Sequence, residues 1–126
     1  MNASEIRRSL DAIKDDPEFG ARCEGLVDDW IAAGFGVEAV DPILRFMETH
    51  PEIDYGMPGA LVHFVERAYL RGYAQLLLDS LARRPTPHTV WMLNRVINGT
   101  EDAALRGRYE RAMERAAVHP LAEHWW

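Results

Sequence analysis

The sequence predicts an all-α protein of six to seven helices. Apolar residues recur every three or four positions along most of the chain, as they do on one face of an amphipathic helix. Proline and glycine stand at the ends of these segments, and no segment shows the alternation of a strand. Short linkers predict antiparallel α-hairpins, arranged as a HEAT-like stack or as a compact helical bundle.

The composition predicts a single helical domain over residues 1–126. With 48% apolar and 27% charged residues, the chain has the balance of a globular protein. One cysteine excludes an intramolecular disulfide. No apolar run approaches the ~20 residues that span a bilayer, and the charged N-terminus is unlike a signal peptide. We therefore expect a cytoplasmic protein that is not bound to a membrane.

The first half of the chain predicts three helices. A short helix over 4–13 precedes a longer one over 17–33, with Asp16 as N-cap and Pro17 in the first helical position. The apolar face of this longer helix is formed by Phe19, Cys23, Leu26, Val27, Trp30 and Ile31. A third helix follows over 37–49, and we expect it to pair with the helix over 17–33 as an antiparallel hairpin.

The second half predicts four more helical segments in two hairpins. Residues 60–71 and 73–83 form one, with a break at Gly72; residues 87–98 and 101–117 form the other. Thr86 and Thr100 are the expected N-caps of the last two helices. Cys23, Asn94 and Leu105 lie inside the predicted apolar faces, so we expect all three to be buried.

The charge is concentrated in the first half. Residues 1–60 hold five Lys/Arg against thirteen Asp/Glu, a net charge of −8, whereas residues 61–126 carry +2 and the whole chain −6. An acidic chain is a poor non-specific binder of nucleic acid. Acidic clustering favours a basic protein partner, through steering and complementarity, although a solvated surface would look the same.

The irregular segment over 51–59 is the best local candidate for partner binding. It combines acids, an aromatic residue and glycines, although an ordinary connector with Tyr55 in the core would have the same composition. We predict that the acids steer the partner and that Tyr55 anchors it. The predicted partner-binding residues are Asp28, Asp29, Glu38, Asp41, Glu52, Asp54 and Tyr55.

No catalytic or metal-binding motif stands out. His63 and Glu66 are three residues apart on one predicted helix, but on its exposed side, and His88 lies on another helix. An enzyme or ligand-binding protein that uses these three groups is the weakest hypothesis. We therefore predict no catalytic residue, no metal and no cofactor. The terminal Trp125 and Trp126 are expected to fold back on the last hairpin or to dock on a second subunit.

A resemblance to a known family rests on two segments of the chain. They are Asp54-Tyr-Gly-Met-Pro-Gly-Ala-Leu-Val-His-Phe-Val-Glu66 and Arg84-Pro-Thr-Pro-His-Thr-Val-Trp-Met-Leu-Asn-Arg95. Together they resemble small helical bacterial immunity proteins of contact-dependent growth inhibition and other polymorphic toxin systems. The likeness covers roughly residues 50–100. The motif positions that it implies to be structural are Pro58, Gly59, Thr86, Pro87 and Asn94.

The resemblance implies an antitoxin in the cytoplasm that binds a cognate toxin domain, often a nuclease, tightly and without catalysis. No contact residue transfers by motif, because the toxin-contacting positions of such families vary. The main alternative is a HEAT-like interaction adaptor, or a homodimer without a toxin partner. The oligomeric state stays open at this stage.

Overall fold

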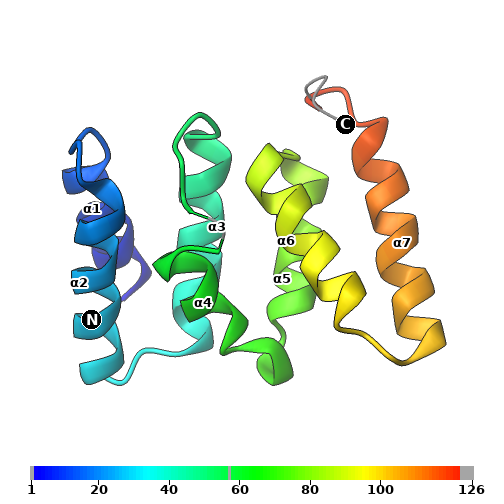
Figure 1. Cartoon of the computed structure of the whole chain (residues 1–126), viewed down its shortest axis with the longest axis horizontal. Helices are drawn as coiled ribbons and strands as arrows, with labels where there is room; N and C mark the ends of the chain where they lie inside the picture. The colour runs from blue at the N-terminus through cyan, green and yellow to red at the C-terminus, as the bar shows by residue number, and fades with distance from the viewer. Residues whose placement is uncertain (1, 57, 123–126) are drawn as a thin grey trace. The chain divides into compact units, whose positions relative to one another are not determined.

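The chain is all-α in a computed structural model that describes residues 2–56 and 58–122. The described residues form seven α-helices and two 3-10 helices and no strand (Figure 1), which confirms the predicted fold class. The elements are α1 (Ala3–Ile13), α2 (Phe19–Ala32), η1 (Val37–Ala39), α3 (Val40–Thr49), α4 (Ala60–Glu66), η2 (Tyr69–Arg71), α5 (Tyr73–Arg83), α6 (Pro87–Asn98) and α7 (Ala103–Ala117).

The helices divide into two compact units, Met1–Tyr73 and Ala74–Trp126, and each is described here by itself. The boundary lies in the first turn of α5. The prediction of one domain over residues 1–126 stays a prediction, since two compact units can belong to one domain. None of the helices in the described residues is long and apolar enough to cross a membrane.

In the first unit, α1 packs against α3, and α2 packs against α4 (Figure 1). The sequence instead predicted that α2 would pair with the helix that follows it. Contact between α2 and α3 is carried by Phe19 and Phe46, whose stacked rings have centroids 6.2 Å apart. The η1 turn explains the change of partner, because the chain passes from α2 through Gly34 and η1 before α3 begins.

An aromatic cluster holds one end of the first unit together. The ring of Tyr55 meets Phe19 and Phe46 edge-on, at centroid distances of 5.9 and 6.3 Å. Edge-to-face pairs at such distances place the positive edge of one ring against the negative face of the other. Arg7 of α1 lies over the opposite part of the cluster, 5.6 Å from the centroid of Phe46, and donates to Thr49 Oγ1. Residues from α1, α2, α3 and the following loop thus meet at one place.

The start of α2 differs from the prediction. Asp16 does not cap a helix that begins at Pro17; the helix begins at Phe19, and the residue in the N-cap position, Glu18, makes no side-chain cap bond. The Asp16 carboxylate instead accepts the Glu18 backbone N–H at 2.7 Å. Asp16 and Pro17 therefore form a turn that leads into the helix, because aspartate competes well for backbone N–H groups outside helices.

The segment predicted as one helix over 60–71 is divided. α4 ends at Glu66, and a separate 3-10 turn, η2, follows over Tyr69–Arg71. Gly72 then takes a left-handed conformation with φ of 102°, as the predicted break requires. The early end of α4 shows that an apolar repeat continuing through a 3-10 turn does not mark one continuous α-helix.

In the second unit, α6 and α7 pack side by side as the predicted hairpin (Figure 1). Thr86 caps α6 as expected: its hydroxyl accepts the Thr89 N–H at 3.1 Å, and the Thr89 hydroxyl accepts the Thr86 N–H at 3.1 Å. The predicted cap of α7 is wrong. Asp102 caps that helix by accepting the Leu105 N–H, while the buried Thr100 hydroxyl donates to the Val96 carbonyl.

Two burial predictions in the second unit are also wrong. Asn94 is exposed, because the buried face of α6 runs through Thr89, Met92, Leu93, Val96 and Ile97. Leu105 is 41% exposed, and α7 buries Tyr109, Ala112 and Ala116 instead. The predictions for Trp125 and Trp126 lie outside the described residues.

Candidate functional site

A groove in the first unit lies between the start of α2 and the loop that leads into α4. Its volume is about 550 Å³, within the range of about 300–1,000 Å³ that is usual for binding sites. We call it the N-terminal groove. Its described lining comprises Lys14, Asp16, Pro17, Phe19, Gly20, Cys23, Glu24, Ile53, Asp54, Tyr55, Gly56, Gly59 and Ala60.

The floor of the groove is formed by Phe19, Cys23 and Tyr55, all of them buried. Burial raises the pKa of the Cys23 thiol to about 12. The Tyr55 hydroxyl donates to the His50 carbonyl at 2.7 Å, and burial, followed by the charge of Glu52, raises its pKa above the ordinary value of 10.0. Both groups are neutral at physiological pH, so the floor is apolar and chemically inert.

Two glycines shape the loop side of the groove. Gly56 has φ of 87°, and the Asp54 carboxylate accepts its N–H at 2.9 Å. Gly59 lies so close to Tyr55 that any side chain at Gly59 would overlap the Tyr55 carbonyl. This close approach shows that the loop folds tightly back on itself. The Gly59 carbonyl accepts the His63 N–H in the first turn of α4.

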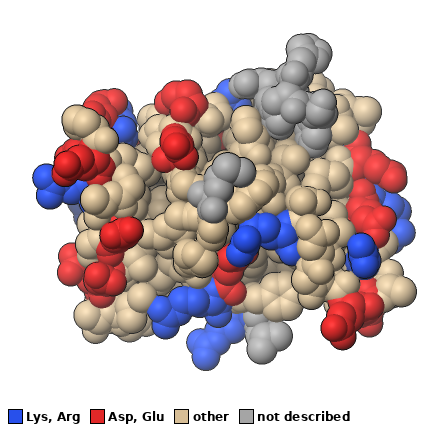
Figure 2. Space-filling model, viewed as in Figure 1, with Lys and Arg blue, Asp and Glu red and all other residues tan. Residues whose placement is uncertain are grey.

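The rim of the groove carries three acids and one base: Asp16, Glu24, Asp54 and Lys14. Hydrogen bonding from the Glu18 N–H, and then the neighbouring Arg22 at 3.2 Å, hold the pKa of Asp16 below its ordinary value of 3.8. Asp16 therefore stays ionised at neutral pH. Figure 2 shows acidic side chains gathered over α1 and α2 and beyond the end of α3.

The groove continues along α4 as a shallower hollow of about 480 Å³ that reaches His63. Glu24, Gly59 and Ala60 line both hollows, so the two adjoin beside the first turn of α4. His63 is exposed, as predicted from its offset from the apolar face.

The structure separates the predicted partner-binding acids into two groups. Asp28, Asp29, Glu38 and Asp41 lie in the C-terminal half of α2, in η1 and at the start of α3. Glu52 and Asp54 follow the other end of α3, which is ten residues, or about 15 Å, long. Of all seven predicted residues, only Asp54 and Tyr55 line the N-terminal groove.

Two of the acids outside the groove are tied to their own elements. The Glu38 carboxylate accepts the Gly36 N–H at 2.9 Å; this bond and one to its own N–H, with Arg71 as a weaker influence, lower its pKa. Asp41 pairs with Arg45 at 2.8 Å on the exposed face of α3. Both carboxylates have partners within their own segments, and neither lines the N-terminal groove.

Tyr55 is 5% exposed and belongs to the aromatic cluster, so it is not a protruding anchor. Its part in the groove is to form the floor. Glu52, by contrast, is exposed and lies 3.6 Å from His50.

Sequence reasoning missed Asp16, Gly20 and Glu24 as parts of the groove. The sequence predicts Asp16 as an N-cap, and no motif distinguishes Glu24. The apolar face of α2 does provide a signal, because Gly20 and Glu24 flank Phe19 and Cys23 and thus border the side that meets the 51–59 segment. This pattern can be interpreted only once the 51–59 segment is known to fold onto α2.

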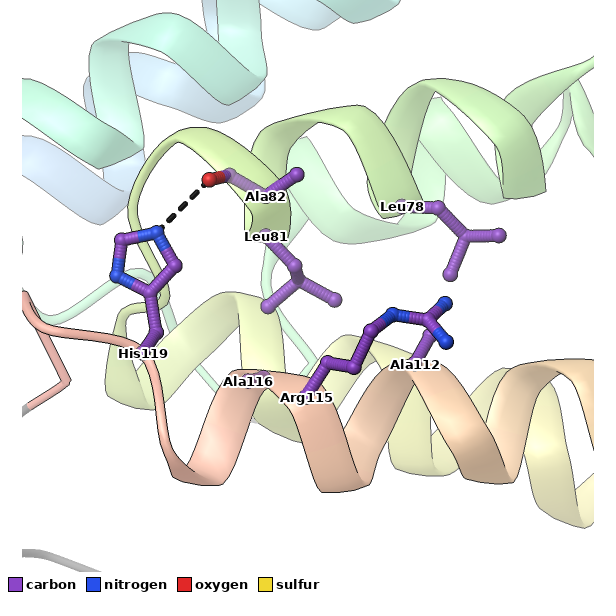
Figure 3. A pocket seen from close by; sticks show the side chains of 7 residues that line it. All are labelled: Leu78, Leu81, Ala82, Ala112, Arg115, Ala116 and His119. Carbon is purple, nitrogen blue, oxygen red and sulfur yellow. Dashed lines mark hydrogen bonds between the residues drawn. The ribbon is translucent and has the colours of Figure 1, made fainter.

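A second hollow, of about 220 Å³, lies between α5 and α7 in the second unit (Figure 3). It is lined by leucines and alanines of both helices, with Arg115 and His119 at its edge. His119 Nε2–H donates to the Ala82 carbonyl at 2.8 Å, and Nδ1 accepts the Leu121 N–H at 3.0 Å. Both ring nitrogens are used to fix the chain after α7 to the end of α5.

The described residues contain no group of three or more His, Cys, Asp or Glu placed to hold a metal ion. His63 and Glu66 belong to α4 and His88 to α6, so they lie in different units. Comparison of the chain with models of protein families, with curated proteins and with solved structures gives no match.

Proposed function

We propose that the chain is a non-catalytic binding protein of the immunity type, which neutralises a cognate toxin domain, a nuclease in our reading, in the cytoplasm. It would do so by holding a basic surface of that domain against the acidic first unit. The observation that carries the proposal is the N-terminal groove, where the acidic residues Asp16, Glu24 and Asp54 border an apolar aromatic floor.

Such a surface suits a cationic partner for two reasons. Opposite charge speeds the encounter and orients it, while apolar contact in the floor slows dissociation. Enzymes that act on nucleic acid present cationic surfaces to their anionic substrate, which an acidic inhibitor can cover. The resemblance of residues 54–66 and 84–95 to immunity proteins supports the same proposal.

The first test is to purify the tagged protein from its native cells and to identify by mass spectrometry what accompanies it. The proposal expects one stoichiometric partner that is the toxin domain of a larger secreted protein. Recovery of the chain alone, or of several unrelated proteins, contradicts it and favours a self-associating or adaptor module.

The second test measures the binding rates of that partner. The double variant Glu52→Lys/Asp54→Lys should lower the association rate by more than it raises the dissociation rate, and added salt should shrink the difference. The matched control, Glu101→Lys/Glu114→Lys, makes the same charge change at exposed positions of the second unit. Unchanged rates for the first pair would remove Glu52 and Asp54 from the binding surface.

A further inference from the structure

Helix α2 contains two glycines that its own packing does not require, one in its first turn and one in its interior. Gly20 and Gly25 both lie within Phe19–Ala32, and neither has a positive φ. A Cβ built at either position meets nothing within 4 Å. Glycine inside a helix costs about 0.5–1 kcal/mol relative to alanine. Both positions would therefore accept a larger residue without a clash, and at Gly25 with a gain in stability.

The two glycines differ in what they face. Gly20 lines the N-terminal groove beside Phe19 and across from the 53–56 segment, whereas Gly25 does not line the groove. A glycine that the fold does not need, placed on the wall of a groove, leaves room for another chain to approach the helix backbone closely.

We propose that the N-terminal groove takes an extended segment of the protein partner, with Gly20 as the position that lets the segment lie against α2. The proposal rests on the proposed function and adds the form and chemistry of what is bound. In the segment, an apolar side chain enters the groove, and its sequence neighbours are lysine or arginine.

The alternation of apolar and basic side chains in this segment follows from the apolar floor and the acidic rim of the groove. Successive side chains of an extended chain point to opposite sides. One side chain can therefore reach the floor at Phe19 and Tyr55 while the next meets the rim. Asp54 and Glu24 are both exposed on that rim, and Lys14 is the one base among the described residues that line it. Charge complementarity selects a basic segment, and it disfavours the acidic first unit of a second copy as occupant.

The test uses the full chain labelled with ¹⁵N and two synthetic probes. One is the capped peptide acetyl-Gly-Arg-Leu-Arg-Leu-Gly-amide, and the other carries glutamate in place of both arginines. The basic peptide should produce saturable amide shifts at Gly20, Gly56 and Gly59, and the acidic peptide should not. Absence of saturable shifts at these glycines with the basic peptide would overturn the proposal.

A matched pair of variants distinguishes an effect on peptide binding in the groove from an effect on the stability of the helix. Neither Gly20→Leu nor Gly25→Leu should lower the melting temperature, since both replace a helical glycine that has open space around it. Gly20→Leu should weaken binding of the basic peptide at least tenfold, and Gly25→Leu less than twofold. If Gly20→Leu binds the peptide as the parent does, the role of Gly20 is wrong.

The same two variants, tested for binding to the partner recovered from cells, distinguish this inference from the proposed function. A partner that binds Gly20→Leu and the parent protein equally well overturns this inference and leaves the proposed function standing. Failure to recover any toxin partner overturns the proposed function, and with it the inference drawn from it.

Discussion

The carbonyl of Tyr55 occupies the space that a side chain at Gly59 would need. Because the obstacle is backbone and not a flexible side chain, Gly59→Ala must open the loop between α3 and α4. We expect this variant to lower the free energy of unfolding by about 1–3 kcal/mol. Chemical denaturation measures it, with Gly25→Ala as the control that should raise stability by about 0.5–1 kcal/mol. Equal stability of the two variants would contradict the close approach.

Removal of the Tyr55 hydroxyl should have a smaller effect. Tyr55→Phe loses the 2.7 Å bond to the His50 carbonyl but keeps the ring contacts with Phe19 and Phe46. The His50 carbonyl keeps a second donor, the Ile53 N–H at 3.3 Å. We expect a loss of about 0.5–1.5 kcal/mol, against about 3–5 kcal/mol for Tyr55→Ala. Thermal unfolding of both variants checks this, and a similar loss in the two would show that the ring itself contributes little.

Removal of the N-cap of α6 should lower the free energy of unfolding. Thr86→Ala removes the buried hydroxyl that accepts the Thr89 N–H, and it should destabilise the protein by about 1–2 kcal/mol. Thr86→Ser keeps the hydroxyl and should lose less. Hydrogen exchange of the first amides of α6 would locate the effect. Exchange that is unchanged in Thr86→Ala would mean that the reciprocal bonds do not hold this helix end.

The Cys23 thiol should be unreactive in the folded protein. With a pKa of about 12 instead of 9.0, about one thiol in ten thousand is ionised at pH 8. Alkylation by iodoacetamide should therefore be about a thousandfold slower than in urea. The raised pKa also means that the folded state keeps a proton that the unfolded chain loses above pH 9. Its contribution to stability is complete below pH 9 and falls as the pH rises towards 12. Rapid alkylation of the native protein would contradict the burial of Cys23.

Several features of the fold were predictable because they depend on local chemistry. The Thr86-Pro87 start of α6 and the Gly72 break follow from the backbone preferences of these residues, and both are confirmed. The burial of Cys23 follows from the apolar repeat of α2 and is confirmed as well.

Other features were not predictable because they depend on tertiary packing. The partner of α2 depends on how η1 directs the chain, and the exposure of Asn94 and Leu105 depends on which face of each helix is covered. The groove itself arises where the 53–60 loop folds onto α2, so Asp16, Gly20 and Glu24 come together from positions that share no sequence pattern with Asp54.

Helix α2 also has consequences for how the groove assembles. It begins without a side-chain cap bond and holds two glycines, so its intrinsic helicity in the unfolded chain is low. Its helical state depends on the burial of Phe19, Cys23, Val27 and Trp30 against the rest of the first unit. The helical state of this wall of the groove therefore depends on tertiary packing more than on local preference.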